Sequence, residues 1–143
     1  MNVDRNSSRR RRGGFTLMEV LLVLVILVIL GSIAVPMYIS VQRDSYMKLA
    51  KNQVNVLETP LNTYRMQVGD FPSSLAALYT APADLADVTK WKGPYLEKRL
   101  PLDPWGNQYQ YQYPGSHNPG TYDVWSMGPD KADGTADDVG NWE

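Results

Sequence analysis

The sequence predicts an α+β fold in which a long N-terminal helix packs on a small antiparallel sheet, with an irregular connection between them and a loop at the C-terminal end. Three observations predict it: an apolar segment of 21 residues near the N-terminus, an apolar stripe that continues the helix, and two short alternating segments near the C-terminus. A chain of 143 residues has room for one compact domain and an anchor. We therefore expect a leader (1–14), a membrane segment (15–36) and a globular domain (37–143).

Composition excludes several classes of function. The net charge of −1 combines a balance of +4 in residues 1–14 with −5 in the remainder, and a mildly acidic body argues against nucleic acid as a partner. There is no cysteine, so disulfides and thiolate metal sites are excluded. A single histidine, His117, leaves little room for imidazole catalysis or zinc binding. We find no nucleophile and base at a recognisable spacing, and expect no enzyme activity.

The apolar segment from Phe15 to Val35 predicts a helix that crosses a membrane. Its 21 residues would span about 31 Å, close to the thickness of the bilayer's hydrocarbon core. The run Arg9–Arg12 precedes it and predicts a cytoplasmic N-terminus, with the globular domain on the other side of the membrane.

Two interpretations of the residues around Gly14 are open. The basic run and its glycines act only as a topology signal, or they give a protease access to extended backbone at the Gly14–Phe15 bond. Glu19 bears on this choice, because a carboxylate in a membrane helix is costly and usually has a partner. Cleavage after Gly14 would create an amino group one helical turn away from it. The simpler interpretation is that Glu19 lies near the interface and reaches water.

The stretch Gly14-Phe15-Thr16-Leu17-Met18-Glu19, followed by an apolar helix, resembles the type IV pilin and pseudopilin class of prepilins. The resemblance implies that a prepilin peptidase cleaves after Gly14 and that the new N-terminal Phe15 is methylated. It also implies that Glu19 takes part in assembly, by pairing with the amino group of a neighbouring subunit. Pro36 matches a proline common in this class.

Beyond Pro36 the helix is predicted to continue along an apolar stripe with spacings of three and four residues. Its members are Met47, Ala50, Val54, Leu57, Leu61 and Tyr64. Pro60 cannot donate the helical hydrogen bond, so we expect a kink there or a break with a second short helix. The stripe continues past Pro60, which favours the kink. The segment from Val68 to Pro72 is expected to end the helix.

The C-terminal half predicts a small sheet after an irregular, proline-containing connection over residues 72–102. A short helix over Ser73–Leu78, capped by Ser73 or Ser74, interrupts that connection. Gln108–Tyr113 and Tyr122–Met127 alternate and are expected to pair as antiparallel strands. Their tyrosines could form a carbohydrate-binding face, but packing of aromatic rings across the strands is the more common arrangement.

An acidic segment, GPDKADGTADDVGNWE, ends the chain. Asp130, Asp133, Asp137 and Asp138 fall within nine positions and are interspersed with glycines. Oxygen ligands with glycine turns suit a hard cation, calcium above all. The spacing is not that of an EF-hand, and from the residues alone a solvated acidic turn is the better interpretation.

Four further stretches, GPYL at 93–96, DPWG at 103–106, YDV at 122–124 and GNW at 140–142, together resemble the major pseudopilins of the type II secretion system. This family implies a pilin-like fold and calcium bound in the loop that ends in Gly-Asn-Trp. The carboxylates of Asp130, Asp137 and Asp138 and the backbone carbonyl of Met127 would be ligands. Asp133 and Val139 are further candidates that the resemblance leaves open.

The resemblance also implies a function. The chain would be a bacterial inner-membrane protein that crosses the membrane once, has its globular domain in the periplasm, and polymerises into a pseudopilus that drives export of folded proteins. Its partners would be copies of itself, minor pseudopilins, the inner-membrane assembly platform, the prepilin peptidase and membrane lipid. Two alternatives are open: a type IV major pilin for adhesion or motility, and a monomeric membrane-anchored binding module.

Overall fold

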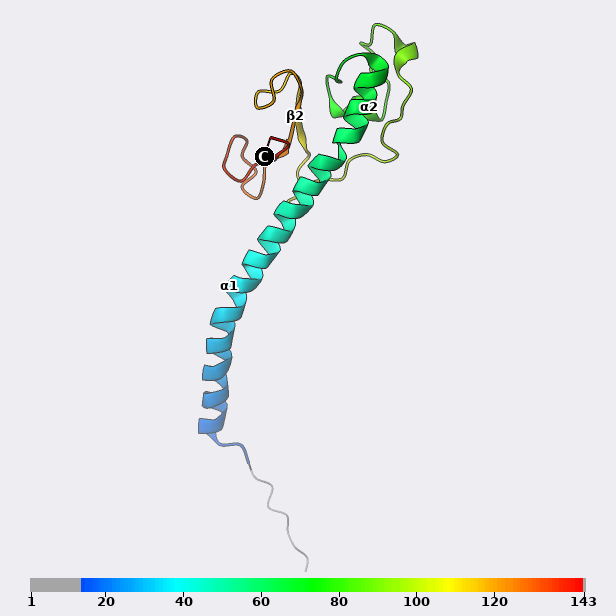
Figure 1. Ribbon diagram of the computed structural model, residues 1–143. Coiled ribbons are helices and arrows are strands. Elements are labelled where there is room, and N and C mark those ends of the chain that lie inside the picture. The colour runs from blue at the N-terminus through cyan, green and yellow to red at the C-terminus, as the bar shows by residue number, and fades with distance from the viewer. Residues whose placement is uncertain (1–13, 143) are drawn as a thin grey trace, which may run out of the picture. The chain divides into compact units, whose positions relative to one another are not determined.

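The structure, a computed structural model, describes residues 14–142 and is drawn in Figure 1. The arginines Arg9–Arg12 and the rest of the expected leader before Gly14 lie outside the described residues. The chain divides into two compact units between Ser40 and Val41. The first unit consists of the N-terminal part of one helix, and the second contains all the remaining elements.

Helix α1 runs from Leu17 to Val56, over 40 residues, and includes Pro36. Its N-terminal half is the one stretch of the described residues that is long and apolar enough to cross a membrane, with a mean hydropathy of 3.0. None of that stretch is buried against the rest of the protein. The predicted apolar segment is therefore confirmed as a helix, and within residues 14–142 its apolar side chains are not buried.

Helix α2 spans Glu58–Val68, and Leu57 alone separates it from α1. Leu57 keeps helical dihedral angles, φ −73° and ψ −16°, and its N–H donates to the carbonyl of Val54. Pro60 has no N–H, so the regular hydrogen-bond pattern is interrupted one turn before it. The interruption is local, and the apolar stripe continues through it. Gly69 ends α2 in the left-handed conformation at φ 109°, as a C-terminal cap.

The sheet has three antiparallel strands in the order β1, β2, β3. Strand β1 is Gln110–Gln112, β2 is Asp123–Ser126 and β3 is Val139–Gly140. Tyr111 pairs with Val124, and Trp125 pairs with Gly140. The two predicted strands are confirmed in shorter form. The third strand was not predicted, because two residues at the end of an acidic loop carry no alternating pattern.

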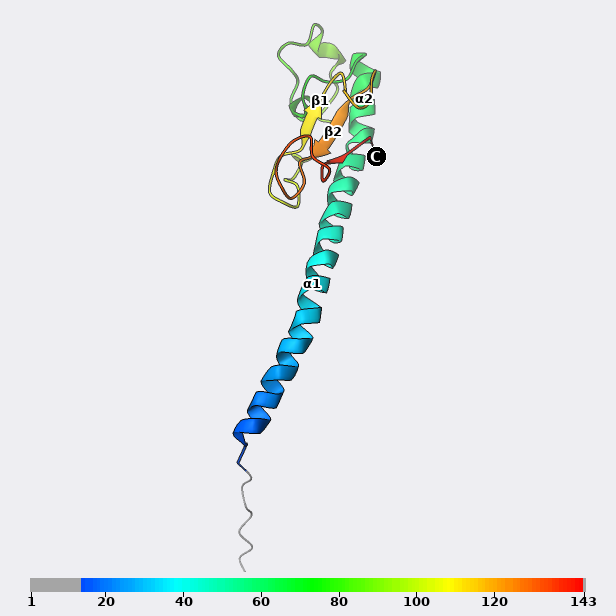
Figure 2. The same cartoon turned by 90° about the vertical axis from the view of Figure 1, so that its left-hand side faces the viewer.

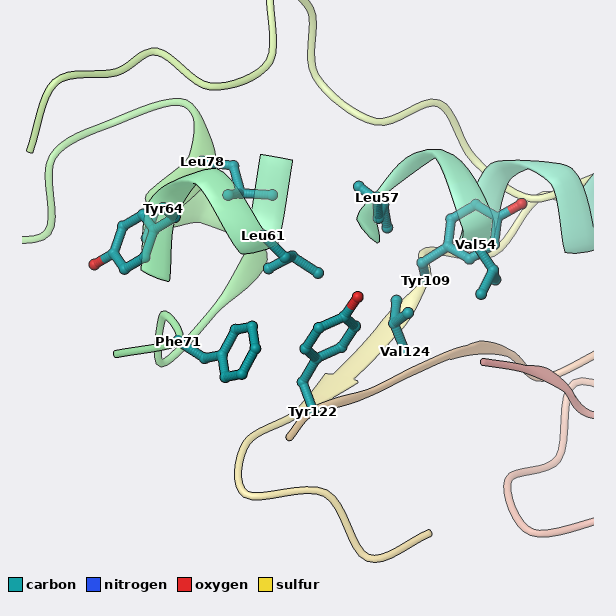
Figure 3. Close-up of a cluster of buried hydrophobic side chains, with 10 residues drawn as sticks. Val54, Leu57, Leu61, Tyr64, Phe71, Leu78, Tyr109, Tyr122 and Val124 are labelled. Atoms are coloured by element: carbon teal, nitrogen blue, oxygen red, sulfur yellow. The ribbon is translucent and has the colours of Figure 1, made fainter. Parts of the chain in front are cut away.

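Strands β1 and β2 lie beside α2 (Figure 2). The core lies between the helical stripe and the inner face of the sheet (Figure 3). From the helices, Val54, Leu57, Leu61 and Tyr64 are at most 3% exposed. Phe71, Leu78, Tyr109, Tyr122 and Val124 meet them from the connection and the sheet. The predicted stripe is thus confirmed, and burial of such side chains is the main favourable contribution to folding.

The irregular connection holds two single turns of 3₁₀-helix, η1 at Leu75–Leu78 and η2 at Val88–Lys90. The predicted short helix is present as η1, but Ser74 makes no side-chain capping bond, so that detail was wrong. The tyrosines of the sheet face inward: the rings of Tyr111 and Tyr122 stack with centroids 6.0 Å apart. The hydroxyl of Tyr111 donates to the carbonyl of Pro72 at 2.8 Å. These rings build the core and not a carbohydrate-binding face.

Candidate functional site

The Gly14–Phe15 bond lies in open, non-helical chain directly before α1. Among the described residues, none beyond its neighbour in the chain comes within 4 Å of the position that a Cβ on Gly14 would take. Phe15 is 83% exposed. A protease must bind its substrate as extended backbone, so this geometry leaves the bond accessible.

Thr16 begins α1 as its capping residue. Its hydroxyl oxygen accepts a hydrogen bond from the N–H of Glu19 at 3.2 Å, which satisfies one of the free donors of the first turn. The Thr-x-x-Glu spacing is the sequence signature of such a cap, and the sequence analysis did not use it. Glu19 is therefore fixed through its backbone, while its side chain is exposed in the first helical turn.

In the acidic loop Asp130 contacts Asp137, and Asp138 follows Asp137 directly in sequence. The N–H of Asp130 donates to Oδ2 of Asp137 at 3.4 Å. The Thr135 hydroxyl, which donates to Oδ1 of Asp137 at 2.7 Å, is the main reason that the pKa of this carboxyl lies below its usual value. Asp138 is 8% exposed, and its Oδ2 accepts from the N–H groups of Gly134 and Thr135.

The other carboxylate oxygen of Asp138, Oδ1, is buried and has no hydrogen-bond partner. Buried oxygens of this kind are rarely left without a donor or a cation. Because this oxygen lies on a residue predicted to bind calcium, the loop fits a hard cation at Asp138. The structure does not, however, bring three or more carboxylate or imidazole side chains into a metal-binding group anywhere in residues 14–142.

The remaining candidates lie differently. Asp133 is bonded to the sheet: its Oδ1 accepts a hydrogen bond from the indole N–H of Trp125 at 2.8 Å. Val139 is buried in β3, where it pairs with Ser126. Met127 follows Ser126 directly, so its carbonyl stands at the start of the loop.

The start of the loop is held by a buried polar chain. The Ser126 hydroxyl donates to Asp103 at 2.6 Å and accepts from the N–H of Gly128 at 3.2 Å. Gly128 has φ +66°, and a Cβ there would collide with the backbone carbonyl of Asp137. The two ends of the loop therefore pack directly on each other, and glycine is required at this contact.

Sequence reasoning missed Asp123, which is fully buried and organises the neighbouring turn. Its carboxylate accepts hydrogen bonds from the N–H groups of Ser116, His117 and Asn118 at 2.7 to 3.0 Å. Burial raises its pKa, but these donors outweigh burial, so the pKa lies below its usual value. The His117 ring stacks on Trp142 with centroids 3.9 Å apart. A lone aspartate in an otherwise apolar strand was the available signal.

Two protein families match this chain, one at its N-terminal segment and one over its globular domain. Residues 9–35 match the family described as the prokaryotic N-terminal methylation motif. This match places the chain in the class of proteins that carry this motif. Residues 37–142 match the family described as type II secretion system (T2SS), protein G. The chain belongs to this family, whose members are the major pseudopilins of the type II secretion system.

Individual relatives support the same assignment. The type II secretion system core protein G of Pseudomonas aeruginosa is 36% identical over 141 residues, which cover 94% of this chain and 98% of that protein. The core protein G of Vibrio cholerae is 40% identical over 139 residues, or 93% of each chain. The crystal structure of the major pseudopilin from the type 2 secretion system of enterohaemorrhagic Escherichia coli has a TM-score of 0.62 at 30% identity. It covers 73% of this chain and 92% of that one.

The family decides between the functions that the sequence left open. The chain is a major pseudopilin, not an adhesive pilin or a monomeric binding module, and it is a structural protein, not an enzyme. Its methylation motif implies processing by a peptidase and assembly into a pilus. One apolar N-terminal helix is consistent with anchoring in the inner membrane.

Proposed function

We propose that this chain is cleaved between Gly14 and Phe15, methylated at Phe15, and assembled through α1 into a periplasmic pseudopilus that drives export of folded proteins. One observation carries the proposal: the exposed, non-helical bond at Gly14 stands immediately before an exposed apolar helix, inside a matching methylation motif. An apolar helix whose side chains are exposed, as here within residues 14–142, must be covered by lipid or by other helices.

Glu19 is the assembly residue in this proposal. Cleavage places a new positive charge at Phe15, one helical turn from Glu19. In a bundle of α1 helices the carboxylate of one copy pairs with the amino group of the next, and neither charge is left alone in an apolar layer. The cap at Thr16 supports this role, because it holds the first turn at Glu19 in helical form.

The proposal also fixes topology and partners. The basic residues before Gly14 keep the N-terminus in the cytoplasm, so the unit Val41–Glu143 lies in the periplasm. The chain would then contact lipid and the prepilin peptidase before assembly. Within the filament it would contact copies of itself, minor pseudopilins and the assembly platform of the inner membrane.

Calcium is the proposed cofactor of the acidic loop. The carboxylates of Asp130, Asp137 and Asp138 would hold it together with the carbonyl of Met127, while Asp133 and Val139 are further candidates. The buried, unpartnered Oδ1 of Asp138 supports this assignment. A bound calcium ion would neutralise carboxylates that otherwise repel one another, and would order the surface that the loop presents to neighbouring subunits.

Intact mass spectrometry tests the processing step. The full chain, produced in cells with a prepilin peptidase, should begin at Phe15 and carry one methyl group. Gly14→Leu should leave the chain uncut, because a branched side chain then occupies the processed position. Gly31→Leu is the matched control, since Gly31 also has open space around it but lies within α1. A wild-type mass that begins at Met1 contradicts the proposal.

Electron microscopy of filaments tests the assembly step. Glu19→Ala should abolish filaments even when cleavage is complete. Thr16→Val removes the cap of α1 but keeps the Glu19 carboxylate, so it should still assemble. Equal loss in both variants would mean that Glu19 acts only by starting the helix.

Thermal melts of the full chain in detergent test the calcium site. All four tryptophans lie in the unit Val41–Glu143, so their fluorescence reports on that unit alone. Calcium at about 100 times its dissociation constant should add about 2.7 kcal/mol and raise the melting temperature by several degrees. Asp137→Asn should remove the gain. Asp87→Asn is the matched control, because Asp87 also accepts a hydrogen bond from a threonine but lies at η2.

A further inference from the structure

Lys51 joins helix α1 to the C-terminal end of the acidic loop. Its Nζ donates a hydrogen bond to the backbone carbonyl of Gly140 at 2.8 Å, across 89 positions of sequence. The bond is partly buried, and Lys51 stands beside Ala50, which is fully buried in the stripe. By sequence pattern Lys51 belongs to the polar face of the helix, yet in the fold it reaches the sheet.

Gly140 occupies the strand that directly follows the loop. In β3 it pairs with Trp125, and the N–H of the next residue, Asn141, donates to the carbonyl of Val124. The sheet therefore holds this segment from one side and Lys51 holds it from the helix side. Asp138 lies two residues earlier, so its position depends on where Gly140 is fixed.

The opposite end of the loop is fixed separately. Ser126 is completely buried and bonds to Asp103, which keeps the start of the loop on β2. Met127 follows there, while Asp137 and Asp138 precede β3. The Ser126 contact at one end and the Lys51 contact at the other therefore both constrain how the Met127 carbonyl lies relative to these two carboxylates.

We propose that Lys51 is a positioning residue for the calcium loop: by holding Gly140 on α1 it preorganises Asp137 and Asp138 for the cation. This inference rests on the calcium site proposed above. Groups that orient metal ligands from behind typically change metal affinity by 10- to 100-fold when they are removed. Lys51 would also couple the loop to the helix, because ordering of the loop would change the position of the Gly140 carbonyl to which Lys51 donates.

Calcium titration calorimetry on the full chain in detergent tests the proposal. Lys51→Met keeps the aliphatic stem and removes the donor, so the dissociation constant for calcium should rise by about tenfold. Lys51→Arg restores a charged donor and should recover most of the affinity. Lys48→Met is the matched control: Lys48 is exposed one turn earlier on α1, and its removal should leave the affinity unchanged.

The outcomes separate this inference from the calcium site itself. If Lys51→Met lowers the melting temperature in chelator but binds calcium as tightly as the wild type, Lys51 is only structural and the inference is wrong. If the wild type binds no calcium, both the proposed site and this inference are wrong. If Lys51→Met fails to fold, as judged by tryptophan fluorescence, Lys51→Arg and Lys51→Gln are compared instead. The charged donor of Lys51→Arg should bind calcium more tightly than the neutral donor of Lys51→Gln. Equal affinities for calcium in these two variants would contradict the positioning role of Lys51.

Discussion

The buried carboxylate of Asp123 accepts a hydrogen bond from the backbone N–H of His117 at 2.7 Å, while the ring of His117 stacks on Trp142. These contacts connect the turn between β1 and β2 with the last described residue of the chain. The carboxylate of Asp123 is completely buried. Besides backbone N–H groups, it accepts hydrogen bonds from the Ser116 hydroxyl and the side-chain amide of Asn118, and the imidazole Nδ1 of His117 lies 3.3 Å away. The turn and the C-terminal segment therefore depend on one ionised side chain.

Replacing Asp123 by alanine should destabilise the protein by about 3 kcal/mol, because several buried N–H donors lose their acceptor at once. Chemical denaturation followed by tryptophan fluorescence measures this change. Asp84→Ala is the control, since Asp84 is exposed and its loss should stay within about 0.5 kcal/mol. Similar losses of unfolding free energy in both variants would show that the buried carboxylate stabilises the fold no more than an exposed one.

Stability should fall at acidic pH, in part through Asp123. Although burial raises its pKa, backbone N–H donors hold the pKa of Asp123 in the folded protein below the usual value of an aspartate, so the folded state favours the ionised form. The stability that it contributes is fully present above about pH 4 and is lost as the pH falls through the lower folded pKa. The difference in unfolding free energy between wild type and Asp123→Asn should therefore shrink between pH 5 and about pH 2. A difference that stays constant over this range contradicts the assignment.

Leu61 is completely buried beneath the sheet, one residue after Pro60. Leu61→Ala should cost about 3 kcal/mol through lost apolar burial and the cavity left behind. Met66→Ala, on the same helix but at a position that is 85% exposed, should cost less than about 0.5 kcal/mol. Urea denaturation gives the unfolding free energy of both variants. A loss at Leu61 as small as that at Met66 would contradict the position of Leu61 in the core.

Gly128 and Gly134 test the packing of the acidic loop. Both have positive φ, at +66° and +80°, but only Gly128 lies where a Cβ would strike the carbonyl of Asp137. Gly134→Ala should cost only the backbone strain, about 1 kcal/mol, whereas Gly128→Ala should cost clearly more and, if the proposed calcium site exists, weaken it. Melts with and without calcium measure both effects. Equal costs would mean that the loop ends are not in contact.

The helical part of the fold could be predicted because its signals are local. The apolar run after Phe15 and the stripe from Ala50 to Tyr64 depend only on spacing along one helix, and both are confirmed. The start of α1 at Thr16 was equally readable from its capping signature. Pro60 was identified as the point of disturbance, although its effect appears at Leu57, next to Val56, whose carbonyl would have accepted the missing hydrogen bond.

The C-terminal part was harder to predict, because contacts distant in sequence determine it. Strand β3 is only two residues long and exists because Trp125 and Ser126 pair with it. Lys51 appears polar and solvent-facing by pattern, and only the fold brings Gly140 to it. In the acidic loop, composition identified the aspartates, but no spacing rule could tell that Asp133 turns to Trp125 while Asp138 turns inward.

The exposed apolar surface of α1 has a thermodynamic consequence for any assembly through this helix. Lipid tails and a bundle of like helices are similarly apolar, so moving α1 from one to the other changes the hydrophobic free energy little. The free energies of α1 in lipid and in the bundle would be nearly equal, so the transfer would be readily reversed. Its direction would then be decided by the few polar groups, above all Glu19, and by contacts between the globular units, so that small changes in either could shift the chain between a membrane pool and a polymer.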